Sequence, residues 1–173
     1  MAEKIDHHHR KVLVKVGNYE IFVGGSAFIK PGDLEDVDIV IPINAEDPLP
    51  MVFGCRYDVL CGYNSGAEDI KDKWANFINK VVVELQKGKK IFAYCFAGHG
   101  RTGMLLASLV AVLESEEASP DPIFAVRERY CPKAVESNYQ AEFVFALRGR
   151  ELPPRYIELG ALLVPDDRFA DKE

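Results

Sequence analysis

The chain has 173 residues, of which 48% are hydrophobic and 28% are charged, and its formal net charge is −6. This length suits one domain with a substantial core, and no apolar run approaches the roughly 18 residues that a membrane span requires. The negative charge argues against nucleic acid as the main partner, because duplex binding rests on clustered Lys and Arg. The first residues lack the hydrophobic block of a secretory signal, so we expect a cytoplasmic protein. We also expect a monomer.

The cysteines and histidines give no sign of a metal centre or of a disulfide framework. None of the four cysteines belongs to a Cys-x-x-Cys pair, and their spacing follows no regular pattern. Three adjacent histidines, His7 to His9, lie near a polar terminus, where a solvated tail is the usual outcome. We therefore expect reduced thiols, no bound metal and no other cofactor.

Strands dominate the prediction for the first third of the chain. The stretch "KVLVKVGNYEIFVGG" predicts two strands joined at Gly17-Asn18, a two-residue turn of the kind that hairpins prefer. Residues 37–43, "VDIVIPI", are rich in β-branched side chains and predict a buried strand. A shorter strand is expected within residues 51–60.

An amphipathic helix is predicted next. Its apolar face repeats at helical spacing and consists of Trp74, Phe77, Ile78, Val81, Val82 and Leu85. A capping-box pattern at Ser65 marks its start, and Gly88 marks its end. The run "KKIFAY" that follows is brief and apolar, which suits a central strand.

The second half of the chain is predicted to be mainly helical. The run "MLLASLVAVL" is apolar all round and predicts a helix buried on nearly every side. Further helices are expected to begin at Asp121-Pro122, with Asp as N-cap and Pro in the first helical position, and at Ser137.

Strands that alternate with helices imply an α/β fold, with a central parallel or mixed sheet flanked by helices on both sides. We expect a single domain over residues 12–150. A flexible N-terminal tail over residues 1–11 and a loosely attached C-terminal tail over residues 151–173 complete the predicted organisation.

The stretch "YCFAGHGRTG" lies between the predicted central strand and the buried helix, at the sheet edge where α/β proteins usually bind ligands. Gly98, Gly100 and Gly103 allow backbone N–H groups to converge at a helix N-terminus, a geometry that suits phosphate. Arg101 adds a rigid fork of donors matched to two oxyanion oxygens. The same groups stabilise a thiolate, so Cys95 is a candidate nucleophile.

The pattern Cys95-x5-Arg101-Thr102, in its fuller form Cys-x-Ala-Gly-x-Gly-Arg-Thr-Gly, resembles the signature loop of the dual-specificity and related tyrosine phosphatases. The segments "YEIFVGGSAF", "DVDIVIPIN" and "VRERYCPKAVESNYQAEF" resemble that family's opening strand, next core strand and post-loop helices. The likeness spans about residues 12–150. It implies an active protein phosphatase that cleaves phosphotyrosine, with phosphoserine and phosphothreonine as further candidates.

The resemblance also assigns roles to residues. Cys95 would attack phosphorus and form a cysteinyl-phosphate, which water then hydrolyses, and Thr102 would donate its hydroxyl to the sulfur. Gln140 matches a position that can help to place the hydrolytic water, although Ser137 and Gln140 also form a capping box, which explains Gln140 structurally. The substrate oxygens would be held by a loop that consists of Phe96, Ala97, Gly98, His99, Gly100 and Arg101.

Ester cleavage also needs a proton for the leaving oxygen, which the family takes from an aspartate on a separate loop ahead of the cysteine. Asp58, in "CRYDVL", and Asp69, in "GAEDIKDKW", are the two candidates. Asp69 falls in the first turn of the predicted helix, where a carboxylate complements the helix dipole. We therefore favour Asp58, with Asp69 and a missing or substituted acid as the alternatives.

The sequence departs from the family at Tyr94, where a histidine that helps to order the loop usually stands. This departure keeps open a catalytically impaired pseudophosphatase that binds phosphorylated partners. A phosphoinositide phosphatase is the other alternative, although Phe96 and His99 stand where such enzymes carry lysines. Rhodaneses and some arsenate reductases also use a Cys-x5-Arg loop, but the Thr102-Gly103 pair favours a phosphatase.

The remaining cysteines have weaker interpretations. Cys55 or Cys61 could form a protective disulfide with Cys95 under oxidation, but nothing in the spacing favours this. Cys131, which precedes Pro132, is predicted to be a packing residue.

Overall fold

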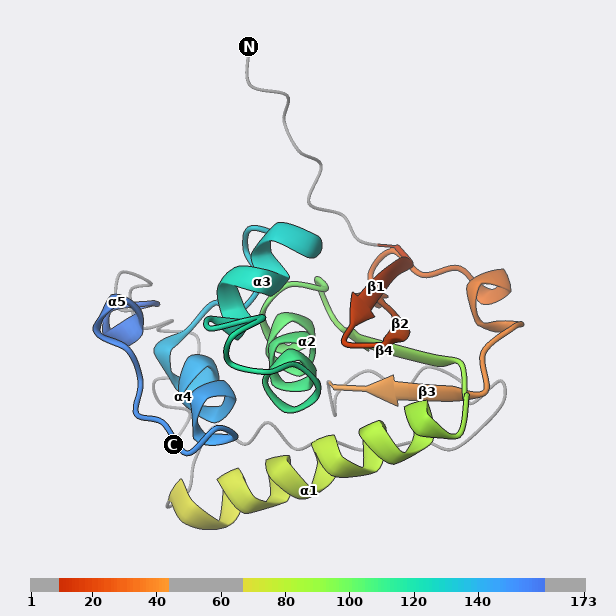
Figure 1. Cartoon of the computed structure of the whole chain (residues 1–173). Coiled ribbons are helices and arrows are strands. Elements are labelled where there is room, and N and C mark those ends of the chain that lie inside the picture. The colour runs from red at the N-terminus through yellow and green to blue at the C-terminus, as the bar shows by residue number, and fades with distance from the viewer. Residues whose placement is uncertain (1–9, 44–66, 161–173) are drawn as a thin grey trace.

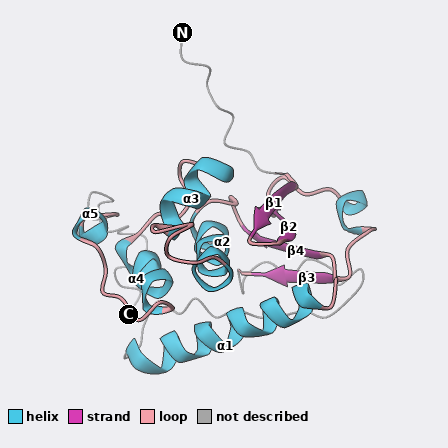
Figure 2. Cartoon of the chain, viewed as in Figure 1, coloured by secondary structure: helices cyan, strands magenta, loops and turns pink. Residues whose placement is uncertain are grey.

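A computed structural model describes residues 10–43 and 67–160, and the structural statements below concern these residues (Figure 1). In chain order the elements are β1 (Val12–Val16), β2 (Tyr19–Gly25), the 3₁₀ helix η1 (Pro31–Leu34), β3 (Ile39–Pro42), α1 (Ala67–Gln86), β4 (Ile91–Cys95), α2 (Gly100–Leu113), α3 (Pro122–Arg129), α4 (Asn138–Ala146) and α5 (Pro154–Ile157). In Figure 2 the strands lie side by side, and α2 lies next to them. The strand expected within residues 51–60, the start signal at Ser65 and the histidines at 7–9 lie outside the described residues.

The four strands form a mixed sheet in the order β1-β2-β4-β3. β1 and β2 are an antiparallel hairpin, whereas β2 and β3 both run parallel to β4. Gly17, in the hairpin turn, has φ +59°, a conformation that glycine adopts without steric cost. The α/β class and the mixed sheet are therefore confirmed, and β4 is the central strand of the fold.

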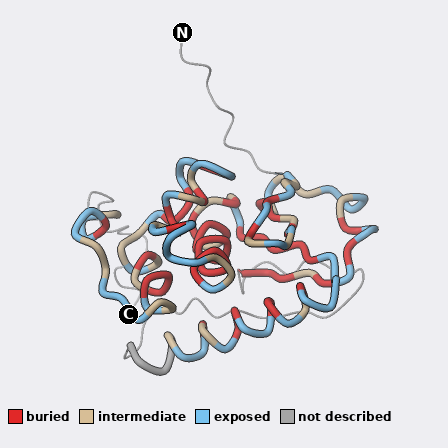
Figure 3. The backbone as a smooth tube through the Cα atoms, in the orientation of Figure 1, coloured by how far each residue is buried: buried red, intermediate tan, exposed pale blue. Residues whose placement is uncertain are grey.

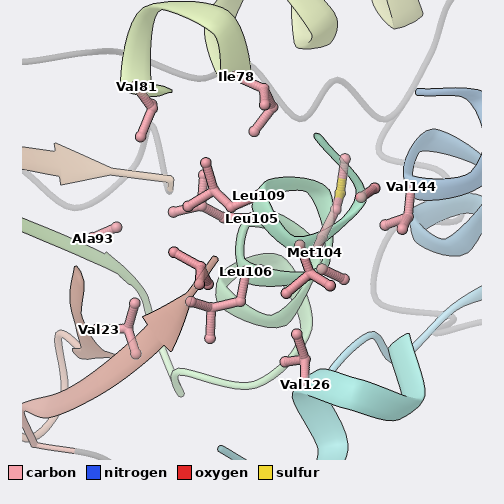
Figure 4. Close-up of a cluster of buried hydrophobic side chains, with 14 of the residues drawn as sticks. Val23, Ile78, Val81, Ala93, Met104, Leu105, Leu106, Leu109, Val126 and Val144 are labelled. Carbon is pink, nitrogen blue, oxygen red and sulfur yellow. The ribbon is translucent and has the colours of Figure 1, made fainter. Parts of the chain in front are cut away.

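Helix α2 runs through the middle of the molecule, as its uniformly apolar sequence predicts. Residues 102–111 are all buried, and Figure 3 shows this helix almost entirely in the colour of buried residues. In Figure 4 the side chains of Leu105, Leu106 and Leu109 lie between those of the sheet and those of α1. Each fully buried leucine contributes about 1.5–3 kcal/mol to folding, so this helix organises the core.

The two faces of the sheet are covered unequally. The α-helices of the described chain pack on the face that carries Val23, Ala93 and Cys95. The opposite face carries Phe92 and Tyr94, which are covered by a small cluster from the segment around η1. Helices therefore cover both sides, as predicted: in the described chain, five α-helices lie on one side of the sheet and one 3₁₀ helix lies on the other.

Helix α1 packs by the predicted apolar face. Trp74 is 3% exposed, and its indole N–H donates to the hydroxyl of Ser108 at 2.9 Å, which ties α1 to α2. The helix ends at Gln86, and Gly88 has φ +78° just beyond it, as the stop signal predicts. None of the helices in the described ranges is both long enough and apolar enough to cross a membrane.

The predicted caps of the last helices are present. The carboxylate of Asp121 accepts the N–H groups of Ile123 and Phe124 at 3.0 Å, and Ser137 caps α4 by accepting the N–H of Gln140 at 3.2 Å. The packing of residues 151–160 differs from the predicted loosely attached tail. Tyr156 is 6% exposed and donates its hydroxyl to Asp121, so this part is packed rather than loosely attached. The predicted domain limits otherwise stay a prediction.

Candidate active site

The candidate loop connects the end of β4, at Cys95, to the start of α2, at Gly100. The segment after β2 fixes its first half, because the carbonyls of Cys95 and Phe96 accept the N–H groups of Ser26 at 2.8 Å and Ala27 at 3.2 Å. The loop therefore lies at the carboxyl edge of the parallel strands, where the sequence predicted it.

Gly98 is the residue that lets the loop turn back. Its φ is +81°, and a Cβ atom there would lie 2.9 Å from the carbonyl carbon of Gly24. Only glycine meets both conditions without strain. The hydroxyl of Tyr130 donates to the Gly98 carbonyl at 2.6 Å and fixes that peptide unit, while burial raises the pKa of Tyr130 far above its usual range.

Two polar contacts join Cys95 to Thr102. The Thr102 hydroxyl lies 3.1 Å from the Cys95 sulfur, and the same oxygen accepts the backbone N–H of Cys95 at 3.0 Å. Thr102 is fully buried, and Cys95 is 6% exposed. Because the oxygen already accepts one hydrogen, its single proton is available to the sulfur or to the Gly24 carbonyl, which is 3.4 Å away.

The other loop residues differ in exposure. Phe96 is 63% exposed, whereas Ala97, His99 and Arg101 are partly buried. Arg101 lies in the first turn of α2, directly before Thr102. The loop thus presents one exposed aromatic ring beside a recessed sulfur.

Tyr94, where the sequence departs from the family, points to the other side of the sheet. It is 1% exposed, and its ring stacks on that of Phe92 with centroids 5.8 Å apart. It belongs to the hydrophobic cluster that includes Leu34 and Val37. Since neighbouring strand residues face opposite sides, Cys95 faces the helices while Tyr94 packs under η1.

Cys131 packs in the core, as predicted, and also contacts the loop. Its sulfur lies 3.3 Å from Nδ1 of His99 and accepts the N–H of Lys133 at 3.4 Å. Burial raises the pKa of the Cys131 thiol, which keeps it protonated. In this contact the tautomer of the His99 imidazole decides which of the two groups donates.

Glu136 and Gln140 meet the loop at Gly100. A Cβ atom on Gly100 would collide with the carboxylate of Glu136 and lie 3.0 Å from Nε2 of Gln140. Oε1 of Gln140 accepts the N–H of Glu136 at 2.8 Å, so the capping box predicted at Ser137 has its returning bond one residue earlier than the usual pattern. Burial raises the pKa of Glu136, and the nearby charge of Lys133 opposes this effect.

The segment that carries Glu136 is held in a strained conformation. Val135 has φ +62°, which is a genuine outlier for a β-branched residue and costs about 1–3 kcal/mol. Arg127 secures the segment by donating to the carbonyls of Ala134 and Val135, both at 2.9 Å. On the other side Gly103 allows close approach, because a Cβ atom there would lie 2.6 Å from the Val135 nitrogen.

None of the contacts described above involves Asp58 or Asp69, the two candidate proton donors. Asp69 falls in the first turn of α1, as expected, and Asp58 lies outside the described residues, as do Cys55 and Cys61. In the part of the chain that the structure describes, no three His, Cys, Asp or Glu side chains are grouped to hold a metal ion.

Sequence reasoning missed the contacts of Cys131 and Glu136 with the loop. Both residues lie in "CPKAVES", between two helices whose starts are marked by strong caps. An acidic residue just ahead of an N-cap is common in proteins and gave no reason to place Glu136 beside Gly100.

Two curated proteins from Methanocaldococcus jannaschii share part of the sequence, and no protein-family model matches it. Uncharacterized protein MJ0215 is 40% identical over 67 residues, which are 39% of this chain and 40% of that protein. Uncharacterized protein MJECL20 is 40% identical over 95 residues, which are 55% of this chain and 60% of that protein. The chain therefore spans less than two thirds of the length of either relative.

Solved phosphatase structures superpose on most of the chain. Tk-PTP in its active form gives a TM-score of 0.59 at 17% identity and covers 80% of this chain and 97% of that one. Kinase associated phosphatase with a serine in place of its catalytic-site cysteine gives 0.54 at 12% identity, covering 82% and 98% of the two chains. Human DUSP28 gives 0.54 at 15% identity, covering 79% and 93%. The chain therefore has the fold of the cysteine-dependent protein tyrosine and dual-specificity phosphatases.

Proposed function

We propose that the chain is a protein phosphatase that hydrolyses phosphotyrosine, with phosphoserine and phosphothreonine as further substrates, through a cysteinyl-phosphate. The observation that carries the proposal is the contact of Cys95 with the Thr102 hydroxyl at 3.1 Å, at the N-terminus of the central buried helix and within a Cys-x5-Arg loop. A hydroxyl donor and a helix N-terminus both stabilise negative charge on sulfur.

In the first step the Cys95 thiolate attacks phosphorus, and the bond from phosphorus to the leaving oxygen breaks. Arg101 and the backbone N–H groups of residues 96–101 hold the three equatorial oxygens, where charge develops. The leaving oxygen takes its proton from Asp58 or, as the alternative, from Asp69.

In the second step water attacks phosphorus, and the electron pair of the sulfur–phosphorus bond returns to Cys95. The Thr102 hydroxyl stabilises the sulfur as a leaving group, and Gln140 helps to place the water. No metal or other cofactor takes part in this scheme.

A phosphorylated protein is the proposed substrate class. Phe96 is 63% exposed beside the recessed sulfur, so its ring can pack against an aryl phosphate or a peptide side chain. The loop between Cys95 and Arg101 contains no lysine, and the Glu136 carboxylate lies at its edge. This balance of charge disfavours a polyphosphorylated lipid head group, because like charges repel at short range.

The direct test compares the wild type with Cys95→Ser on p-nitrophenyl phosphate and on phosphotyrosine, phosphoserine and phosphoinositide substrates. Loss of turnover with unchanged circular dichroism and thermal unfolding is the expected result. Turnover by the serine variant equal to that of the wild type would sink the nucleophile assignment. The acid is tested in parallel, since Asp58→Asn should lower turnover far more than Asp69→Asn.

The packing of Tyr94 under η1 favours one second candidate, a pseudophosphatase. Tyr94 occupies the position of a loop-ordering histidine and lies in a separate hydrophobic cluster. A stable complex with a phosphopeptide and no phosphate release would support this function over hydrolysis.

A further inference from the structure

Glu136 and Gln140 lie together at the edge of the candidate loop. Both side chains approach the position that a Cβ atom on Gly100 would occupy, directly before Arg101. The residue Glu136 is exposed as a whole, but its carboxylate end is turned toward the loop, and burial raises its pKa. Among the described residues, no donor is hydrogen-bonded to this carboxylate.

The orientation of the Gln140 amide is set by its neighbour. Its Oε1 accepts the N–H of Glu136 at 2.8 Å, so Nε2 is the atom that faces Gly100. Toward the loop Gln140 therefore presents a donor, which binds a water molecule through a lone pair of the water oxygen. The protons of that water then need an acceptor, and the Glu136 carboxylate lies at the same glycine.

The backbone supports a positioned carboxylate rather than a chance contact. Val135 precedes Glu136 and has φ +62°, a conformation that persists only where the surrounding structure enforces it. Arg127 enforces it through hydrogen bonds to the carbonyls of Ala134 and Val135. Such strain directly before a side chain at a site edge is typical of functional positioning.

We propose that Glu136 accepts the proton of the water that hydrolyses the cysteinyl-phosphate, while Gln140 Nε2 holds the water oxygen. The oxygen of the water bonds to phosphorus, the sulfur–phosphorus bond breaks with its electron pair on Cys95, and the water proton passes to the Glu136 carboxylate. Glu136 later returns that proton to solvent. This inference rests on the proposed function. Asp58 or Asp69 would donate the proton in the first step, and Glu136 would accept the proton in the second.

Rapid-mixing kinetics of Glu136→Gln on p-nitrophenyl phosphate test the inference. The first step keeps its rate, so a burst of about one equivalent of p-nitrophenol is expected, followed by turnover slower than wild type by roughly 10²-fold, a typical general-base contribution. The cysteinyl-phosphate should then accumulate and be visible by intact-protein mass spectrometry. Glu136→Asp should recover part of the steady rate, because it keeps a carboxylate.

The matched control is Glu117→Gln, which removes an exposed carboxylate elsewhere and should behave as wild type. An unchanged steady rate in Glu136→Gln, or an equal slowing of both steps without accumulation, would overturn the assignment while leaving the proposed function intact. Absence of aryl phosphate turnover in the wild type would overturn the proposed function and this inference together.

Discussion

The two ends of helix α2 differ in how their backbone groups are capped. At its C-terminal end Arg148 donates to the carbonyls of Ala111 at 3.0 Å and Glu114 at 3.1 Å, and to that of Ser119 at 2.6 Å. At its N-terminal end the N-cap residue His99 makes no side-chain capping hydrogen bond within the described structure, and its Nδ1 contacts Cys131 instead. The protein thus satisfies one end of the helix with its own groups and builds a candidate anion loop at the other.

This difference indicates that the C-terminal end of α2 contributes mainly to stability and that the N-terminal end carries the candidate chemistry. The C-terminal end includes an ion pair of Glu114 with Arg129, and Glu114 also accepts the N–H of Gly17 at 2.9 Å. These bonds connect α2 to α3 and to the β1–β2 hairpin. The N-terminal end instead combines a glycine at positive φ, a strained valine and a recessed sulfur. We expect substitutions at the two ends to affect different measurements.

The largest effect is expected at the N-terminal end. Thr102→Val should lower turnover of p-nitrophenyl phosphate by roughly 10²-fold, because it removes the hydroxyl that contacts the Cys95 sulfur. Steady-state kinetics provide the measurement. Thr102→Ser keeps the hydroxyl and should retain most of the activity. Equal activity in the valine variant and the wild type would contradict a catalytic role for the N-terminal end of α2.

A large effect on stability is expected at the C-terminal end. Arg148→Met leaves three carbonyls without their donor and should lower the free energy of unfolding by about 2–4 kcal/mol. Urea denaturation measures this, and turnover of the folded protein should stay within about twofold of wild type. Arg150→Met is the matched control, because Arg150 is in an exposed pair with Glu116 that contributes less than about 1 kcal/mol. A similar loss in both variants would contradict the capping role of Arg148.

The smallest effect is a pH dependence. The hydrogen bond from Arg129 is the main cause that lowers the pKa of Glu114 from 4.5 to about 2. A carboxyl whose pKa is lower in the folded state contributes stability above its unfolded pKa and loses it as the pH falls. The stability advantage of the wild type over Glu114→Gln should therefore shrink between pH 4.5 and about 2. A constant difference across that window, measured by urea denaturation, would exclude the ion pair as its source.

The sequence predicted the parts of the site that are local in the chain. Cys95, Arg101 and Thr102 lie within one short motif between a strand and a helix, so their proximity follows from the motif itself. The caps at Asp121 and Ser137 were predictable for the same reason, since each bonds residues two or three positions away.

The contacts that depend on the path of the chain could not be predicted. The sulfur of Cys131 meets His99 across 32 positions of sequence, and Glu136 reaches Gly100 only because α3 and the following turn fold back on α2. The side of the sheet that Tyr94 faces could have been inferred, because alternation along β4 places it opposite Cys95. The prediction of a loosely attached C-terminal tail was wrong for residues 151–160. Tyr156 donates a hydrogen bond to Asp121, and no local sequence pattern indicates this contact.

The hydrogen bond between Trp74 and Ser108 makes Trp74 an intrinsic fluorescence probe of the contact between α1 and α2. The chain contains one tryptophan, and that indole is buried where α1 meets the central helix. Its fluorescence therefore follows a single event, the docking of α1, without interference from other emitters of its kind. A red shift that precedes the loss of far-ultraviolet circular dichroism would reveal α1 leaving while the remaining helices persist.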